Sequence, residues 1–157
     1  MAGRSAELSR TEQVHVIKPG DLNGGGRLFG GILLQMIDET AAIVAKRHSM
    51  KLNVTTATID NLVFKEGAYE NELLVLVGYV TYTGRTSMEI RVDTYVENIE
   101  GMRRAINRAY LVMVAMDEND KPTPVPPLLV ETEAQRAEWN AAILRKENRI
   151  FRKKEGF

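Results

Sequence analysis

Apolar and polar residues are arranged in two different ways along this chain. Residues 29–48 are rich in Leu, Ile and Ala and contain no proline, which predicts one long helix ending near the cations Arg47 and His48. Beyond this helix the pattern changes to alternating, β-branched segments, which predict strands. Four long strands are expected, at residues 53–64, 73–83, 86–98 and 103–117.

Shorter segments lie on either side of this region. Residues 12–19 alternate and predict a short strand that ends at Pro19–Gly20, whereas residues 1–12 are polar and are expected to be loose. The proline-rich residues 121–128 can form neither a ladder nor a helix and should be extended. Residues 131–157 predict a C-terminal helix.

The order of these elements favours an α+β fold. Consecutive strands joined by short turns form antiparallel hairpins, and the one early helix must then cover the apolar face of the resulting sheet. The alternating strand–helix pattern of a parallel nucleotide-binding sheet is absent. With 157 residues the chain is expected to form one main domain, residues 1–130, followed by a helical, basic tail, residues 131–157.

Composition and charge narrow the classes of protein. Twenty-one Lys and Arg residues balance twenty-one Asp and Glu residues, so the chain lacks the basic excess of a nucleic-acid binder that relies on counterion release. No apolar run reaches the length of about 18 residues that predicts a membrane-spanning helix, and residues 1–10 lack the apolar core of a secretion signal. We therefore expect a cytoplasmic protein with neither a membrane nor a nucleic-acid partner. Cysteine is absent, which excludes disulfides, thiolate nucleophiles and cysteine metal sites.

The long helix carries a carboxylate in apolar surroundings. On a helical wheel Asp38 has small and apolar neighbours, and the first four turns of the helix are apolar almost all the way round. Such a helix is expected to be buried on most sides, with Asp38 in a crevice. Burying a charge is costly, and a catalytic carboxylate is one reason to tolerate it. The alternatives are that Asp38 caps a loop, pairs with an arginine or faces water.

The glycine-rich residues 23–31 precede this helix and raise the question of phosphate binding. A P-loop requires Gly-Lys-Ser/Thr before its helix, and the dinucleotide fingerprint requires glycine where Phe29 stands, so both interpretations are weak. What remains is the positive end of the helix, where Gly30 and Gly31 leave backbone N–H groups free and allow a close approach. That arrangement suits a carbonyl that becomes an oxyanion. The alternative is close packing of the loop.

Other catalytic groups are scarce. The two histidines, His15 and His48, are predicted on a strand face and at a helix end, and they give no metal-ligand spacing. No nucleophile-elbow motif occurs either. No metal site is therefore expected. If the chain is an enzyme, its base or nucleophile is a carboxylate, and Asp38 is the best-placed candidate.

Several motifs, taken in order and with their spacing, resemble one known family. They are N-x-x-G-x-x-F-G-G at 23–31, I-D-E at 37–39, A-x-R-H at 45–48, TTATIDNLVF at 55–64, GRTSMEIRV at 84–92 and VAMDENDKPTPVPPL at 114–128. The chain resembles the hotdog-fold acyl-CoA thioesterases, in particular the brain-type and bacterial broad-range acyl-CoA hydrolases, over roughly residues 12–130. The resemblance implies a long helix wrapped by an antiparallel sheet. It also implies an enzyme that hydrolyses fatty acyl-CoA to free acid and coenzyme A.

The resemblance further implies which residues act. In that family an asparagine before the glycine pair and the aspartate of the Asp-Glu pair form the active site, supplied by two protomers; here these are Asn23 and Asp38. The backbone N–H of Gly31 is implied to polarise the thioester carbonyl. Asp38 would act as general base on water or attack directly to give an anhydride, and Asn23 would orient the water or the substrate. Without the resemblance, Asn23 would be interpreted as an ordinary loop asparagine.

Contacts to the substrate are expected from two further regions. The resemblance places coenzyme A near Arg85, Thr86 and Ser87: the arginine could reach a phosphate or be a solvated turn residue, and the hydroxyls could contact the pantetheine amides. Gly30 and Thr56 are assigned to the same group of substrate contacts. Coenzyme A is then part of substrate and product, so no separate cofactor is expected.

The tail has a local excess of cations between residues 145 and 157. This excess could attract the nucleotide end of coenzyme A, or RNA, but a solvated helix end is the commoner explanation. Trp139 is expected to pack on the body of the protein or on a neighbour.

The assembly state can be inferred from the edges of the predicted sheet. A sheet that wraps one helix leaves edge strands exposed, and pairing two such units edge to edge removes this exposure. The resemblance implies dimers, often in a trimer of dimers, so we expect a homo-oligomer, a hexamer.

A hotdog hydratase or dehydratase would use a histidine that has no match here. A non-catalytic acyl-CoA-binding or regulatory module is disfavoured by the presence of both Asn23 and Asp38.

Overall fold

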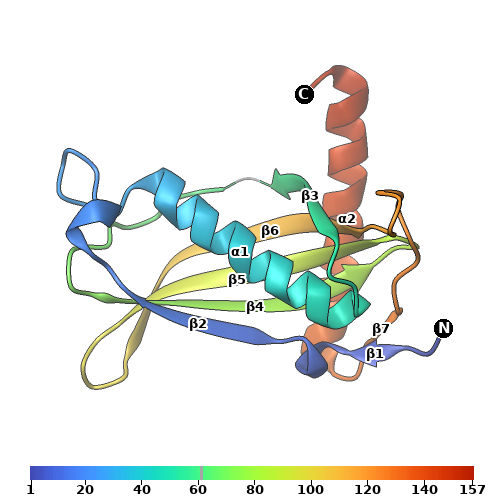
Figure 1. Cartoon of the computed structure of the whole chain (residues 1–157), viewed down its shortest axis with the longest axis horizontal. Helices are drawn as coiled ribbons and strands as arrows, with labels where there is room; N and C mark the ends of the chain where they lie inside the picture. Colours follow the sequence, from blue (N-terminus) through green and yellow to red (C-terminus); the bar gives the residue numbers. More distant parts are fainter. Residues whose placement is uncertain (61) are drawn as a thin grey trace.

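A computed structural model describes residues 1–60 and 62–157 of the chain. A five-stranded antiparallel sheet has the strand order β2-β4-β5-β6-β3, and helix α1 (Gly30–Ser49) lies along one face of it (Figure 1). The strands are β2 (Thr11–Val16), β3 (Val54–Asp60), β4 (Leu73–Thr83), β5 (Ser87–Glu97) and β6 (Arg103–Ala115). The predicted α+β class, with a long helix against an antiparallel sheet, is confirmed.

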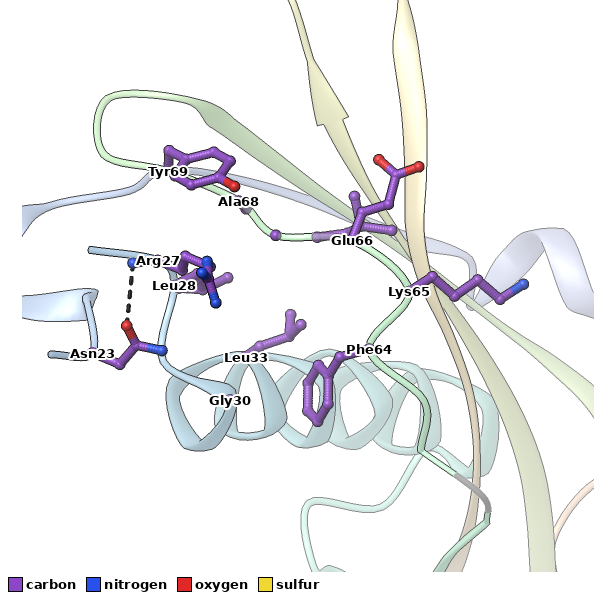
Figure 2. Close-up of a pocket in the computed structure, with 12 residues that line it drawn as sticks. Asn23, Arg27, Leu28, Gly30, Leu33, Phe64, Lys65, Glu66, Ala68 and Tyr69 are labelled. Atoms are coloured by element: carbon purple, nitrogen blue, oxygen red, sulfur yellow. Dashed lines mark hydrogen bonds between the residues drawn. The ribbon is translucent and has the colours of Figure 1, made fainter. Parts of the chain in front are cut away.

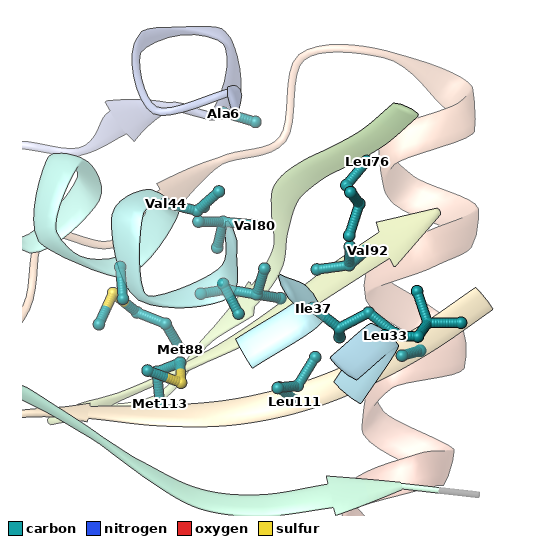
Figure 3. Packing of buried hydrophobic residues seen from close by; sticks show 14 of the residues in the cluster. Ala6, Leu33, Ile37, Val44, Leu76, Val80, Met88, Val92, Leu111 and Met113 are labelled. Atoms are coloured by element: carbon teal, nitrogen blue, oxygen red, sulfur yellow. The ribbon is translucent and has the colours of Figure 1, made fainter. Parts of the chain in front are cut away.

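The main core lies between α1 and the sheet face turned toward it, which we call the inner face. Ile37, Ala41 and Val44 recur at helical spacing on α1 and have no exposed surface. They share one cluster with Ile90 and other side chains from the central strands. Figure 3 shows Leu76, Val92, Leu111 and Met113 of this cluster. Burying one such side chain stabilises the fold by roughly 1.5–3 kcal/mol, so this layer fixes where α1 lies.

The opposite, outer face of the sheet is partly covered by α2 (Glu133–Glu155), which passes behind the sheet and projects beyond it at its C-terminal end (Figure 1). Side chains alternate along β5, so Ile90 enters the core while Glu89 and Arg91 bond to residues of α2. Trp139 of α2 packs on Tyr82 of β4, with 4.5 Å between the ring centroids. The prediction that Trp139 packs on the body of the protein is confirmed.

The expectation that residues 1–12 are loose is wrong. They contain β1 (Arg4–Ser5) and the 3-10 turn η1 (Ala6–Leu8), and Ser9 is fully buried. The reason is a partner far along the chain, because β1 pairs in parallel with β7 (Leu128–Leu129). Leu128 is the last residue of the proline-rich segment, so the expectation that residues 121–128 form no ladder is wrong at that end. A second 3-10 turn, η2 (Pro19–Asp21), follows β2.

The strand predicted at 53–64 is shorter than expected. β3 ends at Asp60; Asn61 lies outside the described residues, and Leu62–Phe64 are not in a strand. Past that point the chain is held by other bonds, since the Asn107 side chain donates to the Val63 carbonyl at 2.7 Å. The apolar residues Leu62–Phe64 therefore belong to a loop that packs on the protein and not to a strand.

The expectation of a solvated basic helix end is also wrong for three arginines of α2. Arg145, Arg149 and Arg152 form ion pairs with carboxylates on the outer face of the sheet. Neither α1 nor α2, the long helices of the described residues, has an apolar stretch that could cross a bilayer.

Candidate active site

Asp38 lies on the flank of α1 and is half-buried. The Thr56 hydroxyl donates a hydrogen bond to Asp38 Oδ1, with 2.5 Å between the oxygens. Thr56 stands on β3 immediately before an irregularity that interrupts the ladder with β6 between Thr56 and Thr58. A carboxylate that is partly removed from water is stabilised by such a donor, so the pair forms a fixed polar point on an otherwise apolar flank.

The surroundings of Asp38 are not closed by this chain alone. Leu34 and Ala42, one turn to either side of Asp38 on the same flank of α1, are also only half-buried. The predicted crevice therefore has one wall, made by α1 and β3. The alternatives of a loop cap or an arginine pair for Asp38 are not what the structure contains, because its partner is Thr56.

Asn23 occupies the loop before α1, at the mouth of a cleft of about 540 Å³ (Figure 2). Its Oδ1 accepts hydrogen bonds from the backbone N–H groups of Gly25 (2.9 Å) and Arg27 (3.2 Å). The side-chain oxygen thus holds the loop, and within the described residues the side-chain NH2 group has no acceptor. The cleft has a mixed lining, with apolar side chains of Leu28, Leu33, Phe64, Ala68 and Ile106 beside the charged Arg27, Lys65 and Glu66.

The first turn of α1 offers two backbone donors. Phe29 precedes the helix in an extended conformation, and the N–H groups of Gly30 and Gly31 donate to no acceptor among the described residues. At Gly31 the space that a side chain would need is already taken, whereas at Gly30 a Cβ would make only an ordinary van der Waals contact. A Cβ on Gly31 would lie 2.6 Å from the Phe29 ring, and one on Gly30 would lie 3.4 Å from the Phe64 ring.

Arg85, Thr86 and Ser87 lie at the opposite end of the sheet, in and just after the turn between β4 and β5. Their carbonyl groups hold the neighbouring chain: that of Arg85 accepts from the Val125 N–H at 3.0 Å and that of Thr86 from the Ala115 N–H at 3.1 Å. The full length of β4, 11 residues, separates this turn from the region of Asn23, and that is roughly 35 Å. One protomer does not bring all the predicted residues together.

The same is true of the predicted catalytic pair. Asp38 follows Gly30 by eight residues on one straight helix, which places it about 12 Å further along the axis. Asn23 lies before the helix, so Asn23 and Asp38 of one chain are too far apart for a shared hydrogen bond. Among the described residues no group of three His, Cys, Asp or Glu side chains could hold a metal ion.

The histidines lie where the sequence predicted. His15 is on β2, and His48 is in the last turn of α1, fully buried between Ser9 and the carbonyl of Pro126. The sequence analysis assigned Thr56 to substrate contacts and did not predict its hydrogen bond to Asp38. No spacing signal could have revealed it, because the two residues come from different elements.

A long helix laid along a five-stranded antiparallel sheet, with a carboxylate on its open flank, defines a hotdog-fold protein of the thioesterase kind. The sequence model of the thioesterase superfamily matches residues 25–102. The chain is also 35% identical over 152 residues to the uncharacterized acyl-CoA thioester hydrolase YkhA of Bacillus subtilis, covering 96% of this chain and 88% of that protein. The chain belongs to the thioesterase superfamily, and the resemblance inferred from its motifs is confirmed.

Solved structures agree with this assignment over nearly the whole chain, α2 included. An apo hexameric acyl-CoA thioesterase is 42% identical, with a TM-score of 0.92 and coverage of 97% of both chains. An acyl-CoA hydrolase from Staphylococcus aureus, in complex with butyryl coenzyme A, coenzyme A and coenzyme A disulfide, is 31% identical with a TM-score of 0.90, covering 97% of this chain and 93% of that one. The cytosolic acyl coenzyme A thioester hydrolase of Rattus norvegicus is 34% identical over 84% of this chain, which spans 35% of that longer protein.

Proposed function

We propose that this protein hydrolyses acyl-CoA thioesters to the free carboxylic acid and coenzyme A. The observation that carries the proposal is Asp38, a carboxylate on the open flank of the central helix whose orientation is set by Thr56. The substrate class follows from relatives that act on acyl-CoA and from a homologue bound to coenzyme A. A thioester already has a good leaving group, so the protein needs chiefly to activate water and to stabilise an oxyanion.

In the proposed mechanism Asp38 takes a proton from a water molecule whose oxygen attacks the thioester carbon. The carbonyl oxygen becomes an oxyanion, which the N–H of Gly31 at the positive end of the partner protomer's α1 stabilises, because Gly31 and Asp38 of one chain lie about 10 Å apart along the helix. The intermediate then breaks its C–S bond, and the thiolate of coenzyme A leaves and takes up a proton. In the second possible route an oxygen of the Asp38 carboxylate attacks the thioester carbon, the C–S bond breaks and the thiolate of coenzyme A leaves and takes up a proton. Water then hydrolyses the resulting anhydride, which releases the carboxylic acid and regenerates Asp38.

A second protomer completes the site in this proposal. Asn23 and Asp38 of one chain lie too far apart, so the Asn23 that serves a given Asp38 comes from the partner, where its free NH2 group orients the water or the substrate. The half-buried flank of α1 and the unpaired edge strand β3 support a partner on this side. The hexameric state of the apo thioesterase supports a hexamer built from such dimers.

The experiment is an acyl-CoA hydrolysis assay with a thiol reagent over a panel of chain lengths. The protein has no cysteine and so does not itself react with the reagent. We expect Asp38→Ala to lose at least about 100-fold in kcat, the scale of a general base. Glu39→Ala is the matched control, because Glu39 is the next residue, is exposed and, among the residues that the structure describes, bonds only to Gln35 of its own helix. No turnover by the wild type on any chain length would refute the enzyme and leave an acyl-CoA-binding module; undiminished turnover by Asp38→Ala would refute the site.

A further inference from the structure

Helix α2 is fastened to the outer face of the sheet by charged groups that are largely removed from water. Arg149 Nη1 lies 2.7 Å from Asp60 Oδ2 and 3.0 Å from Glu89 Oε2, and Arg152 Nη2 lies 2.6 Å from Asp60 Oδ1. The side chains of Glu89, Asp60 and Arg149 are 1%, 10% and 14% exposed. We call Asp60, Glu89, Arg149 and Arg152 the α2 clamp.

The clamp spans three strands. Glu89 on β5 is paired in register with Val112 on β6, and Val112 is paired with Thr58 on β3. Arg149 therefore bridges from β5 to β3 across the intervening strand β6. Arg145 supports the same arrangement, because its guanidinium bonds Glu89 at 2.8 Å and lies 3.6 Å from the centre of the Tyr110 ring on β6.

The clamp holds β3, one of the two edge strands of the sheet. Within residues 1–60 and 62–157, β3 is an edge strand that pairs with β6 alone, and its ladder is interrupted between Thr56 and Thr58. Thr56, before the interruption, bonds Asp38 on α1; Asp60, after it, bonds two arginines of α2. β3 is thus fixed from the inner face at one point and from the outer face at the other.

We propose that Asp60, Arg149 and Arg152 are positioning residues for the reaction. By fixing the end of β3, the clamp fixes where the Thr56 hydroxyl stands and so the orientation of the Asp38 carboxylate. None of the three touches the substrate in this account; they act through Thr56. The inference rests on the proposed function of Asp38.

The test compares kinetics of Asp60→Asn and Arg152→Met with those of Lys153→Met. Asp60→Asn keeps the size of the side chain and leaves Arg149 its bond to Glu89, and Arg152→Met removes a single pair from a partly exposed side chain, so both variants should fold. Lys153 is the exposed neighbour on the same helix and forms no ion pair within the described residues. We expect kcat to fall roughly tenfold in the two clamp variants, while KM changes by no more than about twofold. The expected loss is smaller than the roughly 100-fold loss of rate that a 1 Å misplacement can cause. Lys153→Met should match the wild type.

A double variant shows whether the effect passes through Thr56. In a Thr56→Val background, Asp60→Asn should cause no further loss of kcat, because residues that act through one contact are not additive. Hydrogen exchange of β3 gives a readout without turnover: the β3 amides should exchange faster in Asp60→Asn and not in Lys153→Met.

The outcomes separate the two proposals. Wild-type kcat in both clamp variants, or an equal loss from Asp60→Asn with and without Thr56, would overturn the positioning role. A wild type without any turnover would refute the proposed function and the catalytic role of the clamp with it. In that case the exchange measurement still decides whether the clamp fixes β3.

Discussion

At the scale of single residues, the polar side chains of Asp38 and His48 are each held by specific hydrogen-bond partners. The carboxylate of Asp38 accepts a hydrogen bond from Thr56, and the imidazole of His48 lies between Ser9 Oγ (3.4 Å) and the Pro126 carbonyl oxygen (3.0 Å). Because a carbonyl only accepts, His48 Nε2 carries a proton and the neutral ring suits its site. His48 joins the N-terminal segment, α1 and the proline-rich segment.

His48 makes the stability of the fold depend on pH. Burial lowers the pKa of His48 below its usual 6.5, against the opposing effect of the bond to Pro126. Below pH 6.5 the unfolded chain therefore binds a proton that the folded protein resists, so the free energy of unfolding falls as the pH drops. Thermal melts of His48→Gln should show a shallower fall in Tm than the wild type over roughly pH 8 to 5. A fall in Tm as steep in His48→Gln as in the wild type would contradict this dependence on His48.

Residue roles were predictable only where chemistry or motif pointed to them. Asp38 could be singled out because it is a carboxylate in an apolar run of a chain without other suitable groups. The hydrogen bond from Thr56 to Asp38 could not be predicted, because it depends on β3 passing beside α1 in the folded protein. The roles of Asn23 and Gly31 and the substrate contacts of Arg85, Thr86 and Ser87 stay predictions.

At the scale of elements, the approach of α1 to the sheet depends on a glycine in β4. A Cβ on Gly78 would lie 3.0 Å from Val44 Cγ2 and 3.1 Å from Thr40 Cγ2, both on α1. We expect Gly78→Ala to lower the stability by about 1–3 kcal/mol through overpacking, measured by thermal or urea unfolding. Gly20→Ala is the control, since a Cβ there meets nothing within 4 Å. A Gly78→Ala protein as stable as the wild type would show that the helix has room to move.

The elements themselves were largely predictable where the pattern was long and continuous. β4 has the predicted bounds, residues 73–83, and α1 differs from the prediction by one residue at each end. The errors fall at residues 1–12 and at the end of β3. Both segments are shaped by bonds to distant parts of the chain, to β7 in one case and to Asn107 in the other. The pattern of apolar and polar residues within a short segment gives no information about partners so distant in the sequence.

At the scale of the whole molecule, one chain leaves the predicted site residues apart and presents two open sheet edges. β2 and β3 are the outer strands, and Val14 and Val16 on β2 are 55% and 48% exposed. The flank of α1 around Asp38 is half-buried, and the predicted site residues lie at opposite ends of the sheet. In a dimer with a two-fold axis, the second protomer runs in the opposite direction. The loop that contains Asn23 in one protomer would then approach the flank of α1 that carries Asp38 in the other protomer.

The most direct test is complementation between two inactive variants. Asn23→Ala and Asp38→Ala should each lose at least about 100-fold in kcat when produced alone. Co-expressed in equal amounts, they should regain about a quarter of the wild-type activity, because half of randomly paired dimers are mixed and each mixed dimer has one intact site of two. A mixture no more active than its separate parents would contradict a site shared between two protomers.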